Sequence, residues 1–144
     1  MTVERRDGTG KAVLVLPFCE AVPTWLTPQD TVLRLGPRRW LLLCEDRDVA
    51  ALIDSWRARL GDTTHLLEAA SDRFVTFRVS GADAELSEQL VEPIDALVIG
   101  AAIRTLLGEV PVICHRRESC VDVLVDRSHA HYVDAWLQQT LNAA

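Results

Sequence analysis

The chain has 144 residues, of which 49% are hydrophobic and 25% are charged, a composition typical of a soluble globular domain and too rich in apolar side chains for disorder. Fifteen basic and 21 acidic residues give a formal net charge of −6. A negative net charge does not suit a protein surface that neutralises phosphate groups, so we expect neither nucleic acid nor an anionic membrane as a partner. The polar first ten residues do not resemble a secretory signal, and apolar stretches fall short of the roughly 20 residues that span a bilayer. The sequence predicts a cytoplasmic protein.

No repeat, low-complexity tract or flexible linker divides the chain, so we expect a single domain over residues 1–144. A chain of this size leaves little room for a second core. Residues 1–30 are expected to be a partly extended N-terminal segment. Within it, 11–19 (KAVLVLPFC) contains a strand that ends at a proline, and Pro23 and Pro28 favour an extended connection.

The next segment predicts a hairpin followed by a helix. Residues 31–35 (TVLRL) alternate as a strand does, 40–44 (WLLLC) form a second apolar run, and a Gly-Pro pair between them favours a turn. From Asp48 onward, apolar residues recur with helical spacing, and Gly61 can end the helix in a left-handed conformation. The apolar stripe consists of Val49, Leu52, Ile53, Trp56 and Leu60.

A similar pattern then repeats. Residues 65–69 and 73–79 alternate as strands, and the Ser-Asp pair at 71–72 is expected to form the turn of a hairpin between them. Ser80 is expected to cap a short helix that Pro93 closes.

Three further strands are predicted at 101–107, 110–115 and 121–125, before a final helix that we expect Ser128 to cap. The stripe of this helix consists of Val133, Trp136, Leu137 and Leu141. Antiparallel hairpins with helices on one side predict an α+β fold, a two-layer sandwich of split βαβ type.

Few residues indicate catalysis or metal binding. The sequence has no nucleophile elbow, P-loop, dinucleotide-binding glycine motif or zincin motif. The thiols and imidazoles that could hold zinc are Cys114, His115, Cys120, His129 and His131. Their spacing argues against a shared site, because neighbours on a strand point to opposite faces. We therefore expect exposed histidines beside buried cysteines.

A cysteine nucleophile is also disfavoured. Cys114 or Cys120 could pair with His65 or His129, but no helix N-terminus or cationic pocket in the sequence would lower a thiol pKa. We expect all four cysteines, Cys19 and Cys44 included, to be reduced and buried. Asp122 and Asp126 are expected on the solvent side of a strand and at its exit.

Arginine and tryptophan give the more informative signal, because these residue types most often carry binding energy at interfaces. Trp25 lies in the proline-bearing connection and Trp40 follows two arginines. Each tryptophan either anchors a partner or is partly buried under a loop. The residues considered for a partner interface are Trp25, Arg38, Arg39, Trp40, Arg104 and Arg127.

Several segments together resemble a known family. They are 100–108 (GAAIRTLLG) with the strand at 110–116, 125–137 (VDRSHAHYVDAWL), the turn at 35–42 (LGPRRWLL), and the strand and helix at 72–90. Over about residues 31–141 this pattern resembles the gamma subunit of heterotetrameric sarcosine oxidase. Arg104 and the Arg127-Ser128 pair are its best markers, although Arg104 also fits an outward strand charge.

The resemblance implies a fold like the folate-binding domain of aminomethyltransferases. It also implies a non-catalytic small subunit docked on a large alpha chain that uses flavin and folate, in a complex that oxidises sarcosine or a related N-methyl amine. FAD, FMN, NAD and tetrahydrofolate would then belong to the alpha and flavin-containing beta subunits, with no catalytic, cofactor-binding or metal-binding residue in this chain. The alternative is a stand-alone small folate-binding protein of one-carbon transfer, and a homodimer of the isolated chain stays open.

Overall fold

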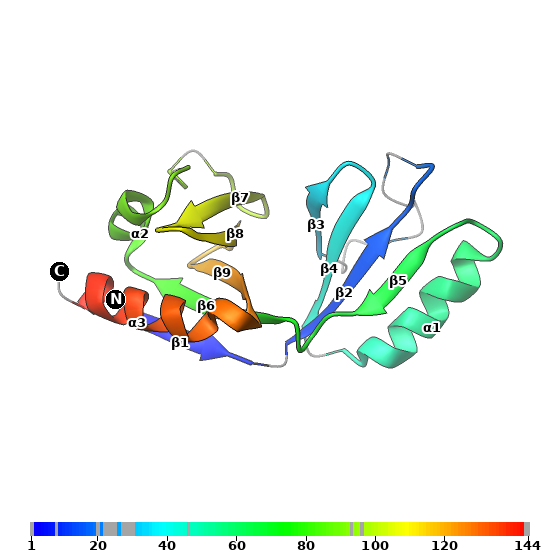
Figure 1. Ribbon diagram of the computed structural model, residues 1–144, viewed down its shortest axis with the longest axis horizontal. Coiled ribbons are helices and arrows are strands. Elements are labelled where there is room, and N and C mark those ends of the chain that lie inside the picture. Colours follow the sequence, from blue (N-terminus) through cyan, green and yellow to red (C-terminus); the bar gives the residue numbers. More distant parts are fainter. Residues whose placement is uncertain are drawn as a thin grey trace. The chain divides into compact units, whose positions relative to one another are not determined.

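A computed structural model describes residues 2–7, 9–19, 21, 26, 31–45, 47–92, 94–95 and 97–142, apart from the side chains of Glu45 and Asn142. The chain forms two compact units. Unit 1 comprises Met1–Gly8 with Asp72–Ala144, and unit 2 comprises Thr9–Ser71. Each unit pairs one antiparallel sheet with its own helices (Figure 1).

Unit 1 is built on a five-stranded sheet with the order β1-β6-β9-β8-β7, in which all neighbours are antiparallel. Its strands are β1 (Thr2–Arg6), β6 (Phe74–Ser80), β7 (Ala102–Leu107), β8 (Val110–Arg116) and β9 (Val121–Asp126). Two hairpins, β7–β8 and β8–β9, are local. The central pairing of β6 with β9 joins segments more than 40 residues apart in sequence, from Phe74 opposite Asp126 to Val79 opposite Val121.

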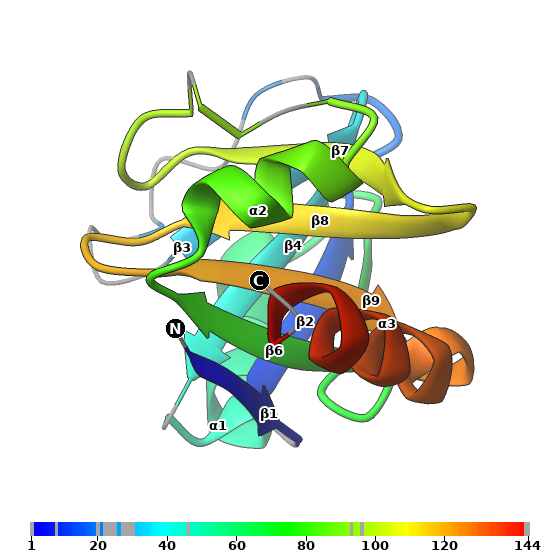
Figure 2. The same cartoon turned by 90° about the vertical axis from the view of Figure 1, so that its left-hand side faces the viewer.

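Helices cover one face of this sheet. Figure 2 shows α2 (Asp83–Gln89) and α3 (Ala130–Asn142) in front of the strands, with the short 3-10 helix η1 (Arg127–His129) leading into α3. Val75, Phe77 and Val79 alternate along β6 and contribute to the buried cluster that includes Leu86 and Leu137. Burial of each such side chain stabilises the folded state by about 1.5–3 kcal/mol. The position of these apolar side chains on one face of the sheet therefore determines which face the helices cover.

Unit 2 is built on a four-stranded sheet with the order β3-β4-β2-β5. Its elements are β2 (Gly10–Val15), β3 (Thr31–Gly36), β4 (Arg39–Glu45), α1 (Val49–Leu60) and β5 (Leu66–Ala69). Both β4 and β5 run antiparallel to β2, which lies between them, so they are parallel to each other. The segment β4–α1–β5 is therefore a split βαβ unit, as the sequence predicted.

Helix α1 forms where its apolar stripe predicts it. The Asp48 carboxylate caps it by accepting a hydrogen bond from the Ala51 N–H at 3.2 Å, and Gly61 ends it with φ 53°. Ile53, Trp56 and Leu60 are buried in the core cluster of unit 2. A helix this short is marginal alone in water, so this packing stabilises it.

Three expectations about the architecture are wrong. The hairpin predicted between residues 65–69 and 73–79 does not form, because β5 pairs with β2 while β6 pairs with β1 and β9. In unit 1, β6 and β7 are antiparallel and separated by two strands, so α2 does not complete a split βαβ unit. The structure has two core clusters where one was expected, since each sheet packs its own helices. The single domain over 1–144 stays a prediction.

Two local details also differ from the sequence analysis. The N-cap of α2 is Ala82, without a side-chain capping bond, so Ser80 does not cap this helix. Strand β1 was missed because TVERR carries a single large apolar residue, Val3, and most of its side chains are exposed. It forms because β6 offers it a long edge, from Thr2 opposite Ser80 to Arg6 opposite Thr76. No helix within the described ranges is long and apolar enough to cross a membrane.

Candidate functional site

The two tryptophans considered for an interface have different outcomes. Trp25 lies outside the described residues. Trp40 is 2% exposed and belongs to the core cluster of unit 2. It pairs with Leu14 in the sheet, and paired residues point to the same face, so its ring lies on the side covered by α1. The assignment of Trp40 to a partner surface is therefore wrong.

Arg38 and Arg39 are exposed at the β3–β4 hairpin. Arg38 has φ 63°, and no other described non-glycine residue has a positive φ. An L-residue in this conformation costs about 1–2 kcal/mol relative to the right-handed region, which is why glycine or asparagine usually occupies such hairpin positions. Backbone strain of this kind concentrates at functional sites.

Phe18 is an exposed aromatic that the sequence analysis missed. Its side chain is 83% exposed. The turn that carries it leaves β2 next to the hairpin, because the Leu16 N–H donates to the Arg38 carbonyl at 2.9 Å and the Cys19 N–H donates to the Leu16 carbonyl at 3.2 Å. The signal that could have found it is its position directly after the proline that ends a strand.

Arg104 and Arg127 lie in unit 1. Arg104 is exposed on β7, the outermost strand of its sheet. Arg127 is exposed in η1, where its Nε donates to the Asp72 carbonyl at 2.6 Å and its N–H donates to the Arg73 carbonyl at 2.8 Å. Arg127 therefore also has a structural role, tying η1 to the start of β6.

The expectation that Ser128 caps the last helix is wrong. Asp126 is the capping residue, since one carboxylate oxygen accepts from the Ser128 N–H at 3.0 Å and from its hydroxyl at 2.8 Å. These bonds, with the favourable charge of Arg73, lower the pKa of Asp126.

Exposed aliphatic side chains gather along the same edge strand as Arg104. They lie on β7 itself or on the segment that leads from α2 into it, and a bond from the Val91 N–H to the Leu106 carbonyl at 3.1 Å holds that segment against the strand. We call these residues the β7 rim. They are Val91, Val98, Ile99 and Leu106, with exposed fractions of 65%, 69%, 66% and 39%.

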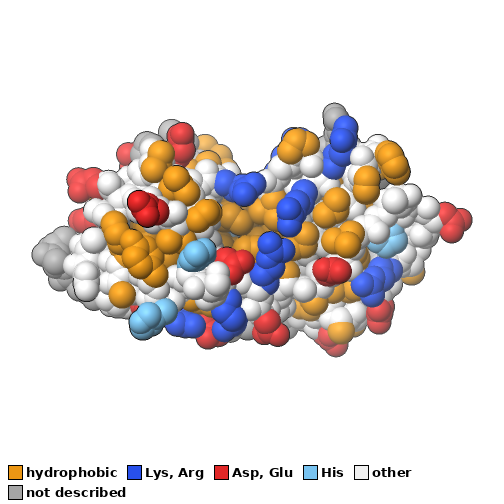
Figure 3. Space-filling model, in the orientation of Figure 1, with side chains coloured by type: hydrophobic (Ala, Val, Ile, Leu, Met, Phe, Trp, Pro, Cys, Tyr) orange, Lys and Arg blue, Asp and Glu red, His pale blue; other side chains and the backbone are white. Residues whose placement is uncertain are grey.

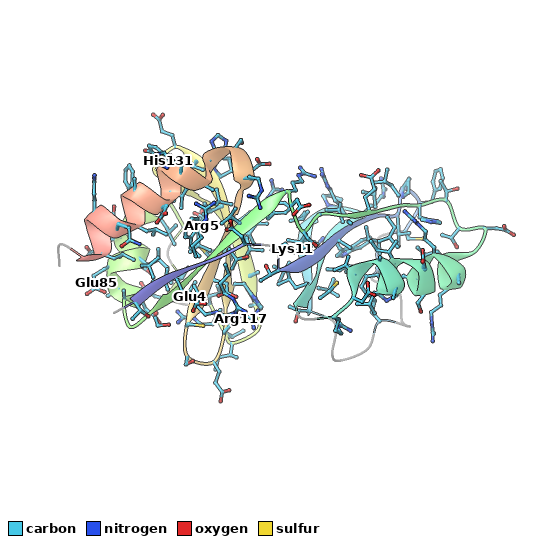
Figure 4. The ribbon with its side chains drawn as sticks, turned by 90° about the horizontal axis from the view of Figure 1, so that it is seen from below. Glu4, Arg5, Lys11, Glu85, Arg117 and His131 are labelled. Carbon is cyan, nitrogen blue, oxygen red and sulfur yellow. The ribbon has the colours of Figure 1, made fainter. Side chains whose placement is uncertain are left out.

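Asp122 is buried, which contradicts its expected place on the solvent side of β9. Its side chain is 2% exposed and accepts two hydrogen bonds from Arg78, at 2.8 and 2.9 Å, and one from Arg117. Burial alone would raise the pKa of this carboxyl, but the hydrogen bonds and charges of the two arginines outweigh it, so the pKa is lowered. Figure 4 labels Arg117, together with Glu4 and Arg5 of β1.

The cysteine and histidine candidates are dispersed. Cys114 is fully buried in the core of unit 1, where desolvation raises the pKa of its thiol to about 12. His115 follows it on β8 and points to the other face, where it is buried, so the expectation of an exposed histidine is wrong at this position. His129 is exposed, and His131 points away from the sheet on α3 (Figure 4). Burial also raises the pKa of Cys120. Cys44 is buried as expected, whereas Cys19 is partly exposed, so the expectation of burial is wrong for Cys19. Within the part of the chain that the structure describes, no three such side chains or carboxylates gather as metal ligands.

The described residues form two antiparallel sheets and three α-helices, which makes the chain an α+β protein. Its fold is similar to that of a chain of heterotetrameric sarcosine oxidase from Corynebacterium sp. U-96, solved in complex with pyrrole 2-carboxylate. The TM-score is 0.84 at 21% sequence identity, over 99% of this chain and 84% of that chain. The resemblance predicted from residues 31–141 is thus confirmed as a likeness of fold. No protein-family model and no curated protein matches the chain.

Proposed function

We propose that this chain is the small, gamma-type subunit of a complex that oxidises sarcosine or a related N-methyl amine. In this proposal it is cytoplasmic, docks on the large alpha subunit, and contributes no catalytic residue. FAD, FMN, NAD and tetrahydrofolate are bound by the alpha and beta subunits. The observation that carries the proposal is the likeness of fold to a chain of heterotetrameric sarcosine oxidase, which extends over 99% of this chain.

The states of the buried titratable groups support a role without catalysis. The Cys114 thiol, with a pKa of about 12, stays protonated at neutral pH and is a poor nucleophile. The Asp122 carboxylate is held ionised between two guanidinium groups, so it is a weak base. Both groups are committed to the packing of unit 1.

The β7 rim supports a role in docking. Four aliphatic side chains that are 39–69% exposed along one edge of a sheet leave apolar surface in water, and exposed apolar side chains of this kind are typical of protein interaction sites. Arg104 on the same strand adds the residue type most often found among interface anchors.

The test is isolation of the affinity-tagged chain from its host, without overexpression. We expect a native mass well above the 16.0 kDa of the chain, flavin absorbance in the co-eluting protein, and oxidation of sarcosine or another N-methyl amine by the assembly. A chain that elutes alone or as a homodimer would contradict the proposal. Binding of tetrahydrofolate by the isolated chain, with turnover of a one-carbon donor, would instead support the stand-alone folate protein.

A further inference from the structure

One end of the unit 2 sheet combines exposed arginines with an exposed aromatic ring. We call this surface the arginine tip and define it as Phe18, Arg38 and Arg39. Arg39 pairs with Val15, the last residue of β2, and Phe18 follows three residues later in the turn bonded to Arg38. Arg34 of the same hairpin pairs with Trp40 and so lies on the opposite face of the sheet from Arg39, outside this surface. In Figure 3, basic and apolar side chains lie next to one another over this end of the hairpin.

The hairpin that carries the two arginines of the tip contains only basic charged residues. The hairpin segment at 31–44 contains three arginines and no aspartate or glutamate. Acidic residues of the same strand pair come at the opposite end, where Glu45 closes β4 and Asp48 caps α1. An acidic chain with a net charge of −6 thus carries a local cationic surface, which favours an anionic ligand at this end of the sheet.

The conformation of Arg38 adds an independent indication. Glycine would adopt its positive φ without strain, yet the chain has an arginine there. Backbone strain of this kind clusters at functional sites, which supports a functional role for this position. The adjacent phenyl ring, 83% exposed, supplies apolar area that a partner could cover.

We infer that the arginine tip binds an acidic segment of the large partner subunit, in which carboxylates flank an apolar or aromatic side chain that covers Phe18. The inference rests on the proposed function for the identity of the partner. Guanidinium groups bind carboxylates through paired hydrogen bonds, and a buried ring beside them excludes water from those bonds. The net negative charge of the whole chain disfavours a polyphosphate such as nucleic acid, so a protein segment is the occupant.

The first experiment measures the affinity of the full-length chain for the purified flavoprotein partner. We expect Phe18→Ser, Arg38→Gly and Arg39→Gln each to weaken binding by about tenfold, with a smaller salt dependence for the two arginine variants. The matched control is Arg59→Gln, which removes the same charge from the exposed face of α1 and should leave affinity unchanged. Arg38→Gly should melt at the same or a higher temperature than the wild type, which separates binding from folding.

Equal affinity of the wild type and all three tip variants would overturn the inference while leaving the proposed function intact. If the wild type forms no flavoprotein complex, the proposed function fails, and the tip is tested directly. The probe is then a synthetic peptide with aspartates on both sides of a phenylalanine, compared with single-stranded DNA and phosphatidylserine vesicles. Peptide binding that Arg39→Gln abolishes supports the tip as an acidic-segment site. No peptide binding, or binding of DNA or vesicles in its place, overturns it.

Discussion

Replacing Asp122 with asparagine tests the buried charge cluster of unit 1. The change leaves Arg78 and Arg117 facing a neutral amide, which offers one acceptor oxygen where the carboxylate offers two. Losing one partner of a buried ion pair costs about 3–5 kcal/mol. The two arginine side chains are 24% and 28% exposed, so water can solvate part of their charge. We therefore expect Asp122→Asn to lower the free energy of unfolding by about 2–4 kcal/mol.

The assay is thermal unfolding of the full chain followed by circular dichroism. A loss of about 3 kcal/mol corresponds to a melting temperature lower by about 6–12 °C in a protein of this size. The matched control is Asp126→Asn at the end of the same strand, where the side chain is 45% exposed and asparagine retains an acceptor for the helix cap. We expect this control to change stability by about 0.5 kcal/mol or less.

The pH dependence separates charge from packing. The folded-state pKa of Asp122 is lowered, so its contribution is fully present above its unfolded pKa of about 3.9. It is lost as the pH falls through the lower folded pKa. The stability difference between the wild type and Asp122→Asn should be constant near neutral pH and shrink as the pH falls below the unfolded pKa. A difference independent of pH, or no larger than that of Asp126→Asn, would refute the reasoning.

Three further changes have expected outcomes. Gly108→Ala should lower the free energy of unfolding by about 1–2 kcal/mol, because φ at this position is 60° and a Cβ would lie 3.2 Å from a tryptophan ring of α3. The control is Gly36→Ala, which has open space around it and should be near neutral in the same denaturation assay. Iodoacetamide at pH 8 should label Cys19 in the native chain and Cys114 only after unfolding, because burial raises the pKa of the Cys114 thiol to about 12. Labelling is measured by mass spectrometry, and rapid labelling of Cys114 in the native chain would contradict its burial. Asp48→Ala should cost about 1 kcal/mol through loss of the α1 cap, measured by urea denaturation, and no change would show that the cap is dispensable.

Local patterns in the sequence predicted the elements whose partners are close in the chain. The stripe of α1 and the β3–β4 hairpin depend on neighbours within a few residues, and both formed as expected. The β5–β6 hairpin failed because a short turn signal does not exclude pairing with more distant strands. Strand β1 has a weak pattern of its own and exists only where β6 offers an edge.

The prediction of Trp40 as an interface residue failed for a related physical reason. Whether a strand residue faces the core or water depends on its register, and a shift of one residue reverses the face. Trp40 pairs with Leu14 and faces α1, while Arg39, one residue earlier, pairs with Val15 and stays exposed. The exposed aromatic at this end of the sheet comes from a separate turn, at Phe18, which reaches the hairpin through backbone hydrogen bonds.

Asp122 shows how topology can bury a carboxylate that alternation alone assigns to solvent. It lies on β9, the third of five strands, so paired strands flank it on both sides. The register places Arg78 of β6 directly opposite it, and the turn before β9 supplies Arg117 five residues earlier in the chain. An ionised carboxylate is tolerated at such a position only with charge partners of this kind. Arg117 and Asp122 are close in the sequence, so this part of the cluster is local. Arg78 joins it only through the pairing of β6 with β9, a long-range feature that no local pattern specifies.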